Sequence, residues 1–324
     1  MTPTPLTFAP MLKPKVWGGI RLASYGKDLG AMKTVGESWE LADLPDSIPE
    51  GRSVVAEGVL AGKTLHSLLQ EDPTWIMGDA ELSPEGGFPL LIKYLDAREN
   101  LSMQVHPDEP WVATHPGDHL KTESWIVLDA EPGAMLYKGI RDGVTREAFA
   151  AAIADGTVVE LVEAVPARVG ECHDLPSGTC HALGAGILVA EIQTPSDTTF
   201  RVFDWGRTDR TLHVEQALAC IAFEPAAAIE PPPVFERDGV RITQLSRTDH
   251  YVIDRIDTDA TSTIHLAAGN APEVLMMLAG RGELPPQTTL ETGRTVLLPA
   301  ALPGVEAALA PGASMLRVML PGHD

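Results

Sequence analysis

The chain has 324 residues, an apolar content of 44% and a formal net charge of −21. Its length and apolar content suffice for two domains or one large all-β unit, and its 29 Gly and 27 Pro favour short elements joined by turns. A body this acidic repels nucleic acids and anionic membranes, so neither is an expected partner.

The N-terminal residues 1–19 have no charged segment followed by an apolar segment, and no run of eighteen apolar residues occurs in the sequence. The three cysteines, Cys172, Cys180 and Cys220, include no CxxC pair, which argues against a disulfide framework and an all-sulfur zinc site. We therefore expect a cytoplasmic protein with reduced thiols.

Residues 88–106 contain an apolar run, a polar turn and then the alternating sequence LSMQVH. This pattern predicts a hairpin of two strands. Because strand side chains alternate, Ser102, Gln104 and His106 should share one face, opposite Met103 and Val105. The result is a polar face within sequence typical of a core.

Further strands are predicted at 124–129 and 186–195, and the stretch 145–156 has helical spacing with a Thr or Asp cap. We expect this stretch to form one short helical insertion near residues 145–165. All other segments with clear periodicity read as strands, so the predicted fold is mostly β.

The best linker candidate is 226–239, because its three consecutive prolines exclude a helix and a central strand. After it, the sequence alternates with period two, which again predicts strands. We therefore expect one domain at 1–230 and a second, also all-β, at 231–324.

The stretch 170–181, GECHDLPSGTCH, has the form G-x5-P-x-G-x2-H, which is the second signature of the cupin superfamily. Gly and Pro make a tight turn, which should direct His181 into the mouth of a barrel. The superfamily's usual Asn four residues later is replaced by Ala185.

The first cupin signature is altered, since Gln104 and His106 replace its usual pair of histidines. Glu123 is the acidic partner that fits best, although a long polar segment separates it from them. Two imidazoles, a carboxylate and an amide oxygen suit Zn²⁺, Fe²⁺ or Mn²⁺, with positions left for substrate. The ligand types alone leave the metal open.

The remaining histidines of this region, His115, His119 and His173, lie in polar sequence, and we expect them at the surface. Cys180 should face away from His181 and act as a small buried hydrophobe, because neighbours on a strand point to opposite sides.

The sequence resembles type I phosphomannose isomerases over its N-terminal two-thirds. The matching stretches are PKVWGG (14–19), GESWELAD (36–43), FPLLIKYLDARENLSMQVHPDE (88–109), KTESW (121–125), PSGTCHALGAG (176–186) and VAEIQTPSDTTFRVFDWGR (189–207). The order and spacing of these stretches also agree with those of the family. The resemblance implies a double cupin, that is, two jelly-roll β-barrels with a small helical insertion.

By the same resemblance, Gln104, His106, Glu123 and His181 correspond to the family's zinc ligands, one ion per chain, with other divalent metals also compatible. The active-site groups it implies are Arg201, an essential arginine, and Glu191, Lys121 and Asp197, which transfer protons or orient the substrate. Ser102 and Lys93 match positions suggested to approach the sugar phosphate. Without the resemblance, Arg201 and Asp197 could form a surface ion pair, and Lys93 could simply extend its stem from a strand.

The implied reaction interconverts mannose 6-phosphate and fructose 6-phosphate through a cis-enediol, with Glu191 as the expected base. The phosphosugar is then the expected partner of a monomer or weak homo-oligomer. The short stretch at 145–165 implies the short bacterial form, without the large helical domain of eukaryotic-type enzymes. Gly293 and Pro299 repeat the cupin turn without a following histidine, so the second barrel should be metal-free.

Two other functions remain open at this stage. Two histidines and a carboxylate also form the facial triad of non-haem Fe(II) oxygenases, although Gln104 as a fourth ligand argues against this. A cupin that binds phosphosugars without catalysis would have the same fold and would tolerate the loss of Arg201 and Glu191.

Overall fold

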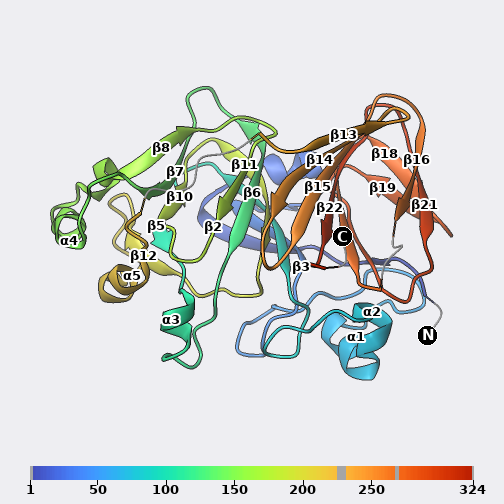
Figure 1. Cartoon of the computed structure of the whole chain (residues 1–324), viewed down its shortest axis with the longest axis horizontal. Coiled ribbons are helices and arrows are strands. Elements are labelled where there is room, and N and C mark those ends of the chain that lie inside the picture. Colours follow the sequence, from blue (N-terminus) through green and yellow to red (C-terminus); the bar gives the residue numbers. More distant parts are fainter. Residues whose placement is uncertain (1–2, 225–230, 267–269, 323–324) are drawn as a thin grey trace.

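The computed structural model describes residues 3–224, 231–266 and 270–322. It is mostly β, as the sequence predicts, and consists of four antiparallel sheets that pack face to face (Figure 1). None of the helices in these ranges combines the length and the hydropathy that a membrane crossing requires.

The first pair of sheets forms the barrel that holds the candidate site. Its six-stranded sheet has the order β2-β3-β4-β11-β6-β9, formed by Met11–Gly19, Val35–Leu41, Leu91–Ala97, Ile187–Gln193, Glu123–Ala130 and Cys172–Leu175. Its five-stranded sheet has the order β12-β5-β10-β7-β8, formed by Phe200–Phe203, Met103–Val105, His181–Leu183, Met135–Ile140 and Val162–Pro166.

The second pair of sheets contains the C-terminal strands. Its seven-stranded sheet has the order β1-β20-β17-β22-β15-β14-β13, formed by Leu6–Thr7, Thr295–Leu298, Glu273–Ala279, Ser314–Met319, Val252–Thr258, Val240–Arg247 and Val234–Arg237. Its four-stranded sheet has the order β16-β21-β18-β19, formed by Ser262–Leu266, Val305–Leu309, Arg281–Leu284 and Thr288–Glu291. The N-terminal strand β1 therefore belongs to the sheet of the last strands, and Figure 1 shows the N-terminus beside them.

The apolar side chains order these sheets into layers. Leu95 and Val189 of the six-stranded sheet pack with Leu183 of the five-stranded sheet inside the first barrel. The opposite face of the six-stranded sheet packs against the seven-stranded sheet, and this contact buries Tyr94 and Ile253 in one cluster. The six-stranded sheet is therefore covered on both faces, which explains why every residue of β4 is buried.

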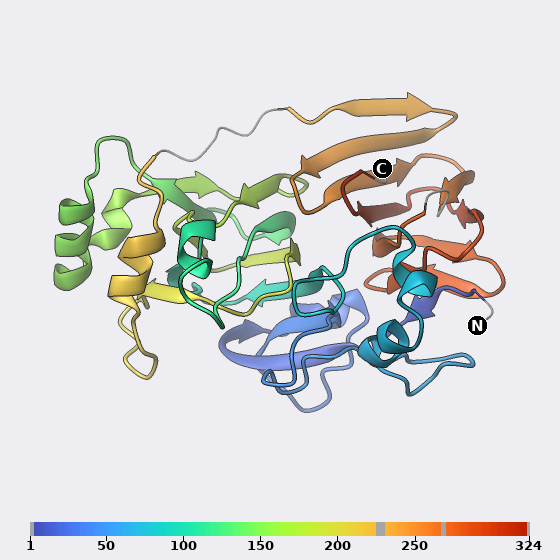
Figure 2. The same ribbon diagram turned by 60° about the horizontal axis from the view of Figure 1, so that its bottom comes forward.

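Short helices cover the outside of these layers (Figure 2). They are α1 (Leu65–Glu71), α2 (Pro73–Met77), α3 (Glu109–Val112), α4 (Arg146–Asp155) and α5 (Val214–Cys220), with 3-10 turns at Arg21–Tyr25 and Val158–Leu161. The predicted helix near 145–165 is confirmed as α4, and Thr145 caps it by accepting a hydrogen bond from the backbone N–H of Ala148. The other four helices were not predicted.

One predicted element is wrong. The stretch 88–106 does not form a hairpin, because β4 and β5 lie in different sheets and pair with other strands. The predicted alternation within β5 is confirmed, since Met103 and Val105 belong to an apolar cluster on one side while Gln104 pairs with His181. Part of the predicted linker, 225–230, lies outside the described residues, and 234–237 form the edge strand β13.

Candidate metal centre and active site

Two rows of paired residues face each other inside the first barrel. Across the six-stranded sheet the row is Trp39, Lys93, Glu191, Trp125 and His173. Across the five-stranded sheet it is Arg201, Gln104, His181 and Lys138. Residues opposite each other on antiparallel strands share a face, and the Trp125 and His181 rings meet edge to face at 5.3 Å between the two sheets. Strand register thus gathers residues that are distant in sequence.

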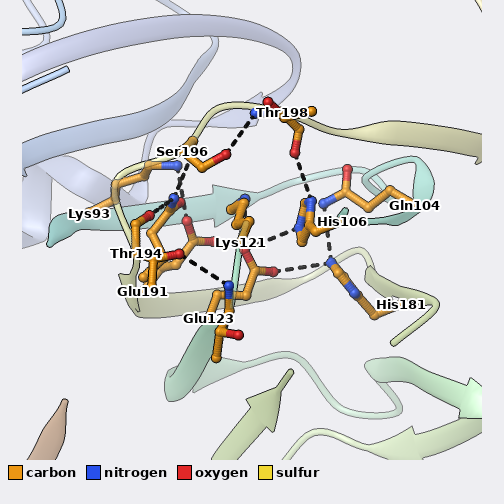
Figure 3. A network of polar contacts seen from close by, with 12 residues as sticks. Lys93, Gln104, His106, Lys121, Glu123, His181, Glu191, Thr194, Ser196 and Thr198 are labelled. Carbon is orange, nitrogen blue, oxygen red and sulfur yellow. Dashed lines mark hydrogen bonds and ion pairs between the residues drawn. The ribbon is translucent and has the colours of Figure 1, made fainter. Parts of the chain in front are cut away.

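His106, Glu123 and His181 form the only group of His, Cys, Asp and Glu side chains in the described part of the chain that could hold a metal ion. Their candidate ligand atoms all lie within 4.8 Å of one another. Nε2 of His106 is 3.4 Å and Nε2 of His181 is 3.1 Å from the Glu123 carboxylate (Figure 3). All three side chains are buried.

Hydrogen bonds to the backbone fix the orientation of both imidazoles. Nδ1 of His106 lies 3.0 Å from the carbonyl oxygen of Thr198, and Nδ1 of His181 lies 2.8 Å from that of Thr179. Because a carbonyl oxygen only accepts, each Nδ1 must carry the proton, which leaves each Nε2 with a lone pair directed at Glu123. Burial, with the nearby Lys121 charge, lowers the pKa of His106 to about 3, so this ring is neutral at ordinary pH.

Glu123 is the anionic member of the group. Burial alone would raise the pKa of its carboxyl, but Lys121 and His106 outweigh that effect and hold the pKa well below its usual value. Nζ of Lys121 lies 2.7 Å from the carboxylate. The carboxylate is therefore ionised although fully buried.

The donor atoms fit a divalent cation. Nε2 of His106 and both oxygens of Glu123 are buried without a well-directed hydrogen bond, which costs free energy unless another group binds there. The Gln104 amide reaches the same place, with Nε2 at 3.3 Å from Nε2 of His181. Rotating this amide by 180° exchanges its nitrogen and oxygen and would present a fourth donor oxygen.

The predicted cupin turn places His181. Gly178 has φ +85°, a left-handed conformation that suits glycine, and a Cβ there would lie 3.0 Å from the carbonyl oxygen of Cys220. Its backbone N–H donates to the carbonyl oxygen of His106, so the turn ties β10 to the segment that follows β5. Cys180 is buried, as predicted.

Glu191 lies in the row opposite the imidazoles and is held from two sides. Nζ of Lys93 is 3.0 Å from one carboxylate oxygen, and the indole N–H of Trp125 donates to the other at 2.8 Å. Ser102 is buried beside the metal group and donates to Oε1 of Gln104 at 3.4 Å.

Arg201 and Asp197 occupy different environments. Arg201 is half-buried at the end of the row that contains Gln104 and donates to the carbonyl oxygen of Thr211 at 2.8 Å. Asp197 is exposed, and among the described contacts it makes no ion pair with Arg201. The structure therefore brings together all the predicted site residues except Asp197.

The sequence suggested that His173 lies at the surface, and this expectation is wrong. The register of β9 turns its side chain inward, opposite Trp125. Burial, with the nearby Lys138 charge, lowers its pKa to about 4. His115 is exposed and His119 pairs with Glu85 at 3.0 Å near the surface, as expected for both.

Glu37 and Trp39 also contribute to the site, and sequence reasoning missed both. Glu37 accepts a hydrogen bond from the indole of Trp39 at 2.7 Å and lies 3.8 Å from Nζ of Lys93. Both residues belong to the GESWE motif, which was the only signal that could have indicated them.

Comparisons with known proteins identify the family of this chain. The catalytic domain of phosphomannose isomerase type I matches residues 6–124. A mannose-6-phosphate isomerase of Streptococcus mutans is 34% identical over 306 residues, which cover 91% of this chain and 92% of that protein. A mannose-6-phosphate isomerase of Bacillus subtilis is 37% identical over 251 residues, 76% of this chain and 74% of that one.

A solved structure extends the similarity to the fold of the whole chain. The crystal structure of mannose 6-phosphate isomerase from Bacillus subtilis superposes with a TM-score of 0.87 at 27% identity, covering 97% of this chain and 99% of the other. With a relative above 30% identity along nearly its full length, this chain belongs to the family of type I phosphomannose isomerases.

Proposed function

We propose that this protein interconverts mannose 6-phosphate and fructose 6-phosphate through a cis-enediol, with one divalent metal, Zn²⁺, bound per chain. The observation that carries this proposal is the buried group of His106, Glu123 and His181, in which His106 Nε2 and both Glu123 oxygens lack a well-directed hydrogen bond. Glu191 lies on β11, the strand next to the one that carries Glu123. The family's relatives named mannose-6-phosphate isomerase support the choice of substrate.

Gln104, His106, Glu123 and His181 would hold the metal. When bound, it supplies a Lewis acid that stabilises negative charge developing on the sugar oxygens. The protein prepares this site in advance, because the two Nδ1 hydrogen bonds fix the imidazoles and Lys121 keeps Glu123 ionised.

Glu191 is the base in this proposal. It removes the proton from C2 of the open-chain aldose while a proton is added to O1, which gives the cis-enediol. It then delivers a proton to C1 as O2 loses its own, which gives the ketose. A positioned acid–base group contributes roughly 10²–10⁴-fold in rate. The contacts of Glu191 with Lys93 and Trp125 support this role because they fix the carboxylate in one orientation.

Basic and polar groups would position the sugar phosphate. Arg201 would anchor negative charge, Ser102 and Lys93 would approach the phosphate, and Lys121 and Asp197 would orient substrate or transfer protons. The half-buried guanidinium of Arg201 in the row of Gln104 supports the first of these roles. Such local cations would let an acidic protein bind an anion.

We also propose the division of the chain into a catalytic domain at 1–230 and a metal-free domain at 231–324. The apolar filling of the second barrel, where Leu275, Leu298 and Leu309 share one cluster, supports a structural role for it. The free thiols of Cys172, Cys180 and Cys220 support a cytoplasmic location.

The decisive experiment is a coupled assay of mannose 6-phosphate isomerisation on protein of measured metal content, before and after chelation. We expect turnover that disappears on chelation and returns with Zn²⁺. Absent turnover, or turnover unchanged after complete metal removal, would defeat the proposal. Activity that requires O₂ would instead support an oxygenase.

A further inference from the structure

A line of four charged side chains runs from the surface to the site, with alternating sign. Nζ of Lys15 lies 3.0 Å from Glu37, and Nζ of Lys93 lies 3.8 Å from Glu37 and 3.0 Å from Glu191. Lys15 has 38% of its side chain exposed, whereas the side chains of the other three are between 4% and 11% exposed. One exposed charge is thus linked to the candidate base through two buried groups.

The inner groups of this line stay charged. Burial would raise the pKa of Glu37, but Lys93, Lys15 and the Trp39 hydrogen bond lower it to about 2. Burial would lower the pKa of Lys93, but Glu191 and Glu37 outweigh this and raise it. Across the pH range of an ordinary enzyme assay, Glu37 is an anion and Lys93 a cation.

The position of Lys93 between two carboxylates has an electrostatic consequence. If Lys93 faced Glu191 alone, its whole charge would stabilise the ionised form of that carboxylate and make it a weaker base. Glu37 offsets part of that charge, and it also fixes the ammonium group in place. Both effects favour a carboxylate that can accept a proton.

We propose that Glu37 is a positioning residue for the isomerisation, which holds Lys93 beside Glu191 and offsets its charge so that Glu191 remains an effective base. This inference rests on the proposed function. It gives Lys93 a role in tuning Glu191, whatever its contact with the sugar phosphate.

Other titratable groups also face Glu191 from the surrounding elements. They are Glu123 on β6, Lys121 just before it, His173 on β9 and His181 on β10, in addition to Lys93, Glu37 and Lys15. Substitutions of Glu37 and Lys15 leave all the other groups unchanged, so a comparison of these two variants isolates the line of charges.

The test is the pH profile of kcat/KM for Glu37→Gln and Lys15→Gln, on enzyme of equal metal content. Removing the Glu37 anion should move the acidic limb to lower pH by about one unit and reduce kcat roughly tenfold. Removing the exposed Lys15 cation should move the limb the other way, by about 0.3 units because solvent screens it. KM should change less than about twofold in both variants, and Glu37→Asp should restore the position of the limb.

Opposite shifts support the proposal. If the acidic limbs of the two pH profiles stay in place, or move in the same direction, the proposal is wrong and Glu37 is a structural residue. Lys15 is at the surface, so Lys15→Gln should fold. Its limb therefore tests the proposal even if Glu37→Gln fails to fold. If the wild-type protein has no mannose 6-phosphate isomerase activity, the proposed function is wrong. If the wild-type protein is active but the limbs do not shift in opposite directions, only the role of Glu37 is wrong.

Discussion

Glu123 is the residue that both imidazoles of the metal group approach, and its charge is the least replaceable part of the site. In Glu123→Gln an amide of similar size replaces the carboxylate, so the proposed metal site loses its only anionic group and Lys121 loses its partner. We expect bound metal to fall from roughly one per chain to below about 0.1 after dialysis, measured by elemental analysis.

Glu191→Gln is the matched control for this measurement. It exchanges the same atoms on the neighbouring strand β11 of the same sheet, where the carboxylate contacts Lys93 and Trp125. It should keep its metal. Full metal occupancy in Glu123→Gln would remove this residue from the ligand set.

Arg201 should separate substrate binding from metal binding. Its guanidinium donates to the backbone carbonyl of Thr211 and is not a member of the group of His106, Glu123 and His181. We expect Arg201→Ala to retain the metal and to lose at least about 10³-fold in kcat/KM, because the proposed charge-assisted anchor for the substrate is gone. Simultaneous loss of metal would show instead that Arg201 supports the structure of the site.

At the level of elements, the turn before β10 combines two constraints. Gly178→Ala forces a side chain into the left-handed region and against the carbonyl oxygen of Cys220, so it should cost about 1–3 kcal/mol of unfolding free energy and weaken metal binding through His181. Gly62→Ala is the control, since its φ is +87° with no atom within 4 Å. It should cost about 1 kcal/mol and leave metal affinity unchanged, as chemical denaturation and metal titration can test. Equal effects of the two substitutions would show that the turn does not position His181.

The sequence predicted those elements whose signal is local. The cupin turn, the strand alternation around Gln104 and the capped helix at Thr145 each depend on a few neighbouring residues, and the structure contains all three. The pairing of β4 and β5 was wrong because the choice of partner depends on strands far along the chain. For the same reason the inward position of His173 and the contact of Glu37 with Lys93 could not be predicted.

At the scale of the whole molecule, the buried His173 should make stability depend on pH. Its pKa is about 4 in the folded state against 6.5 for a free histidine, so between these values the unfolded chain binds more protons. Stability is therefore lost as the pH falls from 6.5 towards 4, with a contribution of up to about 1.4 kcal/mol per pH unit.

His173→Gln removes this titration. We expect a shallower loss of unfolding free energy over that pH range than in the wild type, measured by denaturant unfolding of both proteins in the same metal state. His115→Gln is the control, because that histidine is exposed, and it should leave the slope unchanged. An unchanged slope in His173→Gln would mean that its folded-state proton affinity is ordinary.

The pairing of β1 with β20 joins Leu6 to Leu297, which lie almost a chain length apart. On the ribosome, at roughly 5–20 residues per second, the first strand would wait about 15–60 s before its partner is made. During that time Leu6, which is buried in the finished protein, stays exposed. The seven-stranded sheet therefore cannot be completed during most of synthesis. Until its final strands emerge, the nascent chain exposes an apolar N-terminal segment to which a chaperone can bind.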